Sequence, residues 1–117
     1  MKKLALLAAI TAAGSAILAS AATDGKDRRV TIQNASSQAV YYLYAYPTGV
    51  TPWLEDMLGD EIIPPGTSKV ANFDYGTMDC RFEIKAVMKD GTEHFHRDAD
   101  VCELRTWRIT DDGDSLE

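Results

Sequence analysis

Residues 80–102 read CRFEIKAVMKDGTEHFHRDADVC, and this stretch decides how the chain folds. Residues 81–89 alternate apolar and polar side chains, with Val87 as the exception, as a strand with one buried face does. The positions expected to face the core are Phe82, Ile84, Ala86 and Met88. Asp90-Gly91 follows, which is a strong signal for a tight hairpin turn. The stretch therefore predicts one strand, a turn and a returning strand over residues 92–98.

Cys80 and Cys102 bracket this hairpin and are the only cysteines in the chain. If Lys89 pairs with Thr92 across the turn, Cys80 falls opposite Val101, one residue short of Cys102. A single β-bulge would then bring the two sulfur atoms together. We therefore expect a disulfide, which stabilises a chain by about 3 kcal/mol for a loop of this length. A redox-active pair is the alternative, but it usually has Cys-x-x-Cys spacing.

Further strands are predicted on both sides of the hairpin, over residues 28–34, 39–46, 67–75 and 101–110. Strand 39–46 is apolar on both faces, so we expect it to be central and covered on both sides. The total is six or seven short strands without alternating helices. This pattern predicts an all-β fold, a small antiparallel β-sandwich of the immunoglobulin-like kind.

One short helical turn is expected between these strands. Thr51-Pro52 has the pattern of a helix start, and Gly59 that of a helix end. The turn would carry Trp53, which we expect either to plug an open end of the sandwich or to anchor a partner. The loop over residues 47–59 is accordingly the segment that could protrude.

The first 21 residues predict a secretory signal peptide. Lys2 and Lys3 are followed by an apolar run from Leu4 to Leu18, and Ala19-Ser20-Ala21 has the small-x-small pattern of a cleavage site. An uncleaved membrane anchor is the alternative, but the run is shorter than the roughly 20 residues that a spanning helix needs. We therefore expect cleavage before Ala22 and a periplasmic or secreted protein that is not inserted in a membrane.

The mature chain is expected to divide into a flexible leader (22–27), the β-sandwich domain (28–110) and a frayed acidic tail (111–117). The whole chain has a formal net charge of −6, and removing Lys2 and Lys3 makes it −8. Such a surface repels nucleic acid and anionic membranes and favours a cationic protein as a partner. Plain solubility is the other explanation for the charge.

His94 and His96 form the strongest candidate for a metal site. Alternate residues of a strand share a face, so we expect His94, His96 and Asp98 to point the same way and Phe95 to point into the core. In the register given above, Lys85 lies opposite His96. Two imidazoles and a carboxylate could hold zinc or copper. The alternative is a solvated polar face of the hairpin without a metal, and we expect no cofactor in that case.

The predicted strand 39–46 contains four tyrosines in a stretch of six residues: Tyr41, Tyr42, Tyr44 and Tyr46. If one face of this strand is not part of the core, its rings could present aromatic area to a partner. The alternative is that both faces are covered, with the hydroxyls reaching the margins of the sheet.

Several short motifs together resemble a group of small exported bacterial proteins of unknown function. The motifs are Ile32-x-Asn34-x-Ser36, then Trp53 with Glu55, Asp56 and Leu58-Gly59, then Pro65-Gly66, Cys80, Asp90-Gly91 and Val101-Cys102. Leu54 departs from the pattern, in which a glycine follows the tryptophan. The resemblance implies an exported β-sandwich and carries no activity with it.

No catalytic constellation stands out in the sequence, so we do not expect an enzyme. The expected function is an exported, non-catalytic binding or structural module of the bacterial envelope. One alternative is a proteinaceous inhibitor of a cationic envelope-attacking hydrolase, with Trp53 as the anchor of its inhibitory loop. The other is a metal-binding protein that uses His94 and His96.

Overall fold

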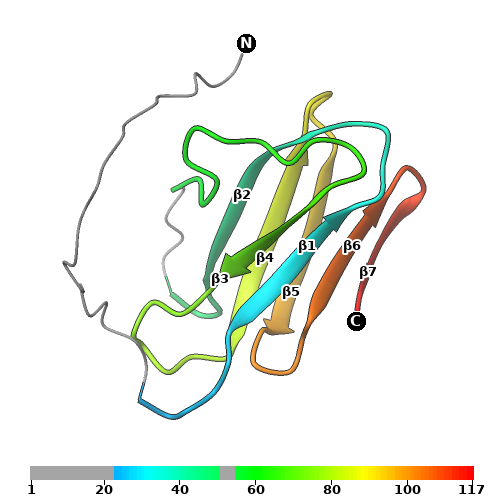
Figure 1. Cartoon of the computed structure of the whole chain (residues 1–117). Coiled ribbons are helices and arrows are strands. Elements are labelled where there is room, and N and C mark those ends of the chain that lie inside the picture. Colours follow the sequence, from blue (N-terminus) through cyan, green and yellow to red (C-terminus); the bar gives the residue numbers. More distant parts are fainter. Residues whose placement is uncertain (1–22, 51–54) are drawn as a thin grey trace, which may run out of the picture.

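The computed structural model describes residues 23–50 and 55–117, and this part of the chain is all-β, without a helix (Figure 1). It contains seven strands: β1 (Arg29–Asn34), β2 (Val40–Pro47), β3 (Ser68–Asn72), β4 (Arg81–Met88), β5 (Glu93–Asp100), β6 (Thr106–Thr110) and β7 (Gly113–Leu116). The prediction of an all-β sandwich with six or seven strands is confirmed. None of the described residues forms a helix long and apolar enough to cross a membrane.

The strands form two sheets, one with the order β3-β1-β6-β7 and the other with the order β2-β4-β5. Figure 1 shows the first sheet lying in front of the second. The first sheet is mixed, because β1 pairs with β6 in parallel whereas β3 and β7 join it antiparallel. The sequence predicted antiparallel pairing alone. The two parallel strands lie far apart in the sequence, so the intervening strands of the other sheet supply the crossover that a parallel pair needs.

The core lies between the sheets and is built from alternate residues of their strands. All four core positions predicted for β4 are buried. They meet Val30 and Ile32 from β1 and Trp107 and Ile109 from β6, each of which is 0% exposed. Because Trp107 is large and fully buried, it ties β6 firmly to the interior.

Strand β2 lies at an edge of its sheet, so the prediction that it is central is wrong. Its free edge is instead closed by the loop that follows it. The Met57 amide donates to the Leu43 carbonyl at 2.7 Å, and the Leu43 amide donates to Asp56 Oδ1 at 3.0 Å. Val40 and Ile63 exchange two backbone hydrogen bonds, at 2.9 and 3.0 Å. These bonds satisfy an edge that would otherwise invite another strand.

The helical turn expected at residues 51–59 is only partly described. Thr51, Pro52, Trp53 and Leu54 lie outside the described residues. The remainder is a hydrogen-bonded turn, in which the Gly59 amide donates to the Asp56 carbonyl at 3.1 Å. The described part of this segment is therefore a turn and not a helix.

The β4–β5 hairpin forms as predicted, but its turn has three residues instead of two. The Gly91 amide donates to the Met88 carbonyl at 2.9 Å, the Met88 amide donates to the Thr92 carbonyl at 2.8 Å, and Gly91 has a φ of +90°. This is a turn followed by a glycine in the left-handed region, which glycine adopts without steric cost. The extra residue moves the pairing on β5 by one position, so His96 lies opposite Ile84.

This shift turns every side chain in the first half of β5 to the other face. Phe95, which was expected in the core, is 41% exposed, and it pairs with Lys85. His94 and His96 point inward instead. The predictions that Phe95 is buried and that Lys85 lies opposite His96 are therefore wrong.

A bulge near Asp98 restores the predicted register at the far end of the hairpin. Phe82 pairs with Ala99 and Arg81 with Asp100, and Asp98 has a φ of +57°. The Val101 amide then donates to the Cys80 carbonyl at 2.8 Å. The bulge offsets the extra residue of the hairpin turn, so Cys80 lies opposite Val101, and Cys102 reaches Cys80 from the turn that follows β5. The predicted disulfide is confirmed, but the bulge near Asp98 is not the one that was expected to align the two cysteines.

The chain ends in a strand rather than in a frayed acidic tail. Residues 113–116 form β7, which pairs with β6, and the Glu117 amide donates to the Thr106 carbonyl at 2.8 Å. Gly113, with a φ of +150°, allows the turn between the two strands. Asp114 thereby reaches the margin of the core, where a tail would have left it in solvent.

Candidate functional site

The carboxylate of Asp114 is the centre of a polar cluster at one side of the sandwich. His94 Nδ1 lies 3.2 Å from Asp114 Oδ1, and His96 Nε2 contacts Oδ2. Trp107 Nε1 donates to the same Oδ2 at 2.8 Å. The His96 ring also meets Trp107 edge-on, with the ring centroids 5.7 Å apart. We call His94, His96 and Asp114 the His–Asp cluster.

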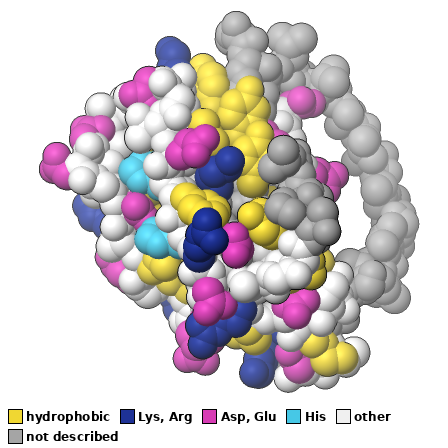
Figure 2. Space-filling view, turned by 180° about the vertical axis from the view of Figure 1, so that it is seen from behind, with side chains coloured by type: hydrophobic (Ala, Val, Ile, Leu, Met, Phe, Trp, Pro, Cys, Tyr) yellow, Lys and Arg dark blue, Asp and Glu magenta, His cyan; other side chains and the backbone are white. Residues whose placement is uncertain are grey.

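The His–Asp cluster joins the edges of the two sheets. Its histidines come from β5, the last strand of one sheet, and its aspartate from β7, the last strand of the other. The side chains of His94, His96 and Asp114 are 10%, 30% and 15% exposed. Figure 2 shows the two histidines along one margin of the β2-β4-β5 sheet. The cluster is therefore largely buried but can be reached from solvent.

The surroundings of Asp114 keep it ionised. Burial raises the pKa of its carboxyl, but hydrogen bonds from His96, Trp107 and His94 outweigh this effect and hold the pKa below its ordinary value. Hydrogen bonds to a carboxylate favour its charged form. The cluster therefore presents a negative charge between two imidazoles near neutral pH.

The ligand set His94, His96 and Asp98 that the sequence suggested is not assembled. The Asp98 side chain is 57% exposed and lies 3.5 Å from Arg81 Nη1, because the bulge turns it away from the histidines. Asp114 takes its place, 20 residues from His94 in the sequence. The sequence feature that indicates the position of Asp114 is Asp112-Gly113, a turn motif that begins a further strand, whereas these residues were expected to belong to a tail.

The donor atoms of the His–Asp cluster are close together but not arranged as a formed metal site. A nitrogen from each histidine and an oxygen of Asp114 do not all lie within 4.8 Å of one another. Among the described residues, the donor group that meets this distance is Cys80, Asp100 and Cys102. Its sulfur atoms are joined in a disulfide, which leaves no thiolate to bind a metal.

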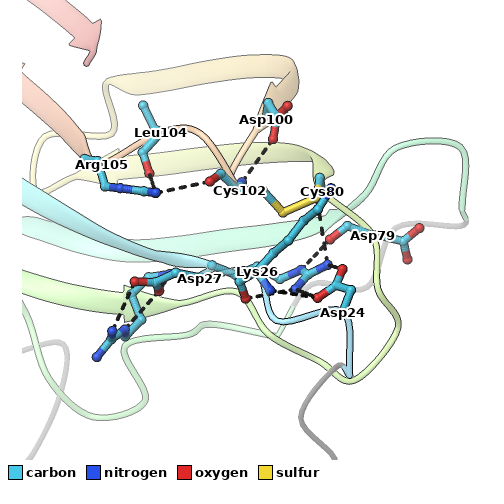
Figure 3. Close-up of a disulfide and its surroundings, with 11 residues drawn as sticks. Asp24, Lys26, Asp27, Asp79, Cys80, Asp100, Cys102, Leu104 and Arg105 are labelled. Carbon is cyan, nitrogen blue, oxygen red and sulfur yellow. Dashed lines mark hydrogen bonds and ion pairs between the residues drawn. A yellow bond between two sulfur atoms is a disulfide. The ribbon is translucent and has the colours of Figure 1, made fainter.

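The predicted disulfide between Cys80 and Cys102 is present, with 5.3 Å between the Cα atoms (Figure 3). Arg28 packs over it and is only 2% exposed. Its guanidinium donates to the Asp79 carbonyl at 2.6 Å and lies 3.8 Å from the sulfur of Cys80. These contacts describe a covered, structural cross-link.

Arg28 also holds the segment that precedes β1. Its two terminal nitrogens donate to the two oxygens of Asp24, at 3.0 and 2.6 Å. The hydrogen bond from Arg28 holds the pKa of Asp24 well below its usual range. The segment expected as a flexible leader is thus tied back at Asp24 onto the disulfide region (Figure 3).

Three of the four tyrosines line the outer face of the β2-β4-β5 sheet. Tyr42 and Tyr44 stack with 6.0 Å between ring centroids, and Lys85 Nζ lies 5.5 Å from the centre of the Tyr44 ring. The Tyr46 hydroxyl donates to Glu83 Oε1 at 3.1 Å, and burial together with this bond raises the Tyr46 pKa. The fourth, Tyr41, lies where the register shifts and meets Tyr42 edge-on.

Phe95 extends this tyrosine row across the sheet, and Arg97 lies 5.6 Å from the centre of its ring. We define the aromatic face as Tyr42, Tyr44, Tyr46, Val87 and Phe95. Figure 2 shows hydrophobic side chains gathered on this side of the molecule, with basic and acidic side chains among them. The tyrosines are half-buried, and charged side chains of the central strand β4 lie among the rings, with Lys85 between Tyr44 and Phe95 and Glu83 beside Tyr46.

No protein-family model, no curated protein and no solved structure matches this chain. Among the described residues, the His–Asp cluster and the aromatic face are the two candidate functional sites.

Proposed function

We propose that this chain is an exported, non-catalytic binding module of the bacterial envelope, and that the aromatic face binds a cationic protein. The observation that carries the proposal is the row of rings on the outer face of the β2-β4-β5 sheet. Tyr42, Tyr44 and Tyr46 are half-buried there, and Phe95 is 41% exposed. Aromatic side chains are enriched at protein interfaces, because a rigid ring buries much area at low entropic cost.

The outer face of the other sheet supports this choice by contrast. It presents mainly hydroxyl, amide and guanidinium groups, from Thr31, Gln33, Ser68, Thr106, Arg108 and Ser115. Val70 is the apolar exception and is 57% exposed. Since one sheet is aromatic on its outer side and the other is polar, the two faces of the sandwich are not equivalent as binding surfaces.

The charge of the chain indicates what kind of partner the aromatic face would take. After removal of the expected signal peptide, the formal net charge is −8. Long-range attraction then favours a cationic protein, and it acts on the rate of encounter more than on the final affinity. Affinity would come from the rings, since the charges beside them (Glu83, Lys85, Glu93 and Arg97) are of both signs.

Export is supported by two independent features. The first 21 residues have the pattern of a signal peptide. The disulfide between Cys80 and Cys102 is consistent with an oxidising compartment, because such bonds persist mainly outside the cytosol. The sequence contains no catalytic constellation, and for that reason we propose binding without catalysis.

The test is capture of envelope proteins on the immobilised mature chain, compared across matched variants. Phe95→Ser removes a ring from the aromatic face, and Val70→Ser removes an exposed apolar side chain from the other sheet as the control. We expect the wild type and Val70→Ser to retain the same cationic protein and Phe95→Ser to retain at least tenfold less. Retention should weaken near 1 M salt, where charges are screened beyond about 3 Å.

Equal retention by all variants would remove the aromatic face as the binding site. A sole specific ligand that is an uncharged glycan, bound equally at low and high salt, would remove the electrostatic part of the proposal. The inhibitor alternative is tested in the same experiment. If the retained protein is a cell-wall hydrolase whose activity falls on binding, the module acts as its inhibitor. The loop expected to inhibit it contains Trp53, which lies outside the described residues.

A further inference from the structure

We propose that the His–Asp cluster binds one divalent transition-metal ion, zinc or copper, with His94, His96 and Asp114 as its ligands. This site is separate from the aromatic face and goes beyond the proposed binding function. Two imidazoles and one carboxylate are a common ligand set for zinc, and imidazole also suits copper. A three-residue set leaves one position of a tetrahedral ion for water or for a partner's side chain.

The strand geometry brings these ligands together from two sheets. His94 and His96 are alternate residues of β5 and both point inward, while Asp114 faces them from β7. The 3.2 Å between His94 Nδ1 and Asp114 Oδ1 is close to the spacing of about 3.3 Å between neighbouring ligands of tetrahedral zinc. His96 contacts the other oxygen of the same carboxylate. An ion could therefore replace a proton between a histidine and Asp114 without moving the strands.

Binding would require a small side-chain movement. The nitrogens of both histidines and an Asp114 oxygen do not yet all lie within 4.8 Å of one another. Rotation of one imidazole about its side-chain bonds would bring the second nitrogen to the ion. His96 is the more exposed of the two histidines, with 30% of its side chain accessible, and its rotation would release its contact with Asp114 Oδ2 and its edge-on packing against Trp107.

Trp107 fixes the carboxylate for this role. Its ring is fully buried, and its Nε1 donates to Asp114 Oδ2 at 2.8 Å. Such outer hydrogen bonds orient metal ligands and strengthen binding. Because Trp107 holds Oδ2, the other oxygen, Oδ1, remains directed toward His94.

The charges around the cluster favour a cation. Lys85 and Arg97, the basic side chains of β4 and β5 nearest to the histidines in sequence, lie over Tyr44 and Phe95 on the outer face and so point away. A pocket of about 110 Å³ adjoins His94. The residues that line it include two further carboxylates, from Asp90 and Asp111. An ion can therefore approach through a negatively charged opening.

The test is calorimetric titration of the tag-free, metal-free mature chain with zinc and with copper. We expect one ion per chain, bound with a dissociation constant of about 1 μM or less. His96→Ala and His94→Ala should each weaken binding by at least tenfold, and so should Asp114→Asn. Asp98→Asn is the matched control, since Asp98 lies on the same strand but points away, and it should bind as the wild type does.

Electron paramagnetic resonance of the copper-loaded chain gives an independent readout, because two coordinated imidazoles split the signal in a recognisable way. This measurement uses the wild type and so does not depend on whether Asp114→Asn folds. Absence of heat at micromolar protein would overturn the proposal. So would affinity that is unchanged in both histidine variants, or a copper signal without two nitrogen ligands.

Discussion

Asp114→Ala tests most sharply how the two sheets are held together at their β5 and β7 edges. The carboxylate contacts His94 and His96 from one sheet and Trp107 from the other. Because Trp107 is 0% exposed, its Nε1 would be left in the interior without the acceptor that it now has. We therefore expect a large loss of stability from a residue that the sequence placed in a tail.

The size of the loss can be worked out from these contacts. A buried donor left without a partner costs about 1–3 kcal/mol. The two imidazole contacts, which are partly solvated, add about 1 kcal/mol together. We expect Asp114→Ala to lower the free energy of unfolding by about 2–4 kcal/mol. Asp114→Asn keeps an oxygen for Trp107 and should cost about half as much.

The assay is urea unfolding followed by far-ultraviolet circular dichroism, with Asp112→Ala as the control. Asp112 is exposed in the turn two residues away, and its replacement should change stability by less than about 0.5 kcal/mol. A loss below 1 kcal/mol for Asp114→Ala, or an equal loss for Asp112→Ala, would refute the reasoning.

The pH dependence of this stabilisation has a definite sign. The pKa of Asp114 is lower in the folded chain than its ordinary value of 3.8, so the unfolded chain takes up this proton first as the pH falls. The stabilisation by the carboxylate is therefore complete above about pH 4 and is lost as the pH falls through the lowered pKa. The difference in stability between the wild type and Asp114→Asn should shrink over the same range.

Three further predictions concern the disulfide, the bulge and export. Replacing Cys80 and Cys102 together by Ser should lower the free energy of unfolding by about 2–5 kcal/mol in urea, and two free thiols in the unfolded, non-reduced wild type would contradict the cross-link. Asp98→Gly should leave stability unchanged or raise it by up to about 1 kcal/mol, because Asp98 has a φ of +57° that glycine adopts more easily; a loss above 1 kcal/mol in urea unfolding would count against the bulge. The intact mass of the exported protein should correspond to a chain that begins at Ala22, and a mass that retains Met1 would disprove cleavage.

The parts of the fold that follow from local patterns could be predicted from the sequence. Strand β4 alternates apolar and polar residues except at Val87, and each of its expected core residues is buried. The disulfide could be predicted from the positions of Cys80 and Cys102 on either side of the hairpin, although the turn shifts the register beside it by one residue. These features depend on residues close together in the sequence, so a single chain is sufficient to find them.

The candidate site could not be predicted because it depends on a choice of one residue in a turn. Asp90-Gly91 is compatible with both a two-residue and a three-residue hairpin loop. A two-residue loop would turn both His94 and His96 outward, and a three-residue loop turns both of them inward. Asp114 joins them through long-range contacts between sheets, which no local pattern encodes. The edge position of β2 was missed for a similar reason, since the loop residues Asp56 and Ile63 cover it.

The proposed function depends most directly on where a bound protein lies on the sandwich. Amide hydrogen exchange, measured on the mature chain alone and in complex with the captured cationic protein, locates that surface. We predict slower exchange in residues 40–47 and 93–97, which carry the aromatic face, and no change in residues 68–72 on the opposite sheet. Slowing confined to residues 68–72, with none in β2 or β5, would contradict the proposal that the aromatic face is the binding surface.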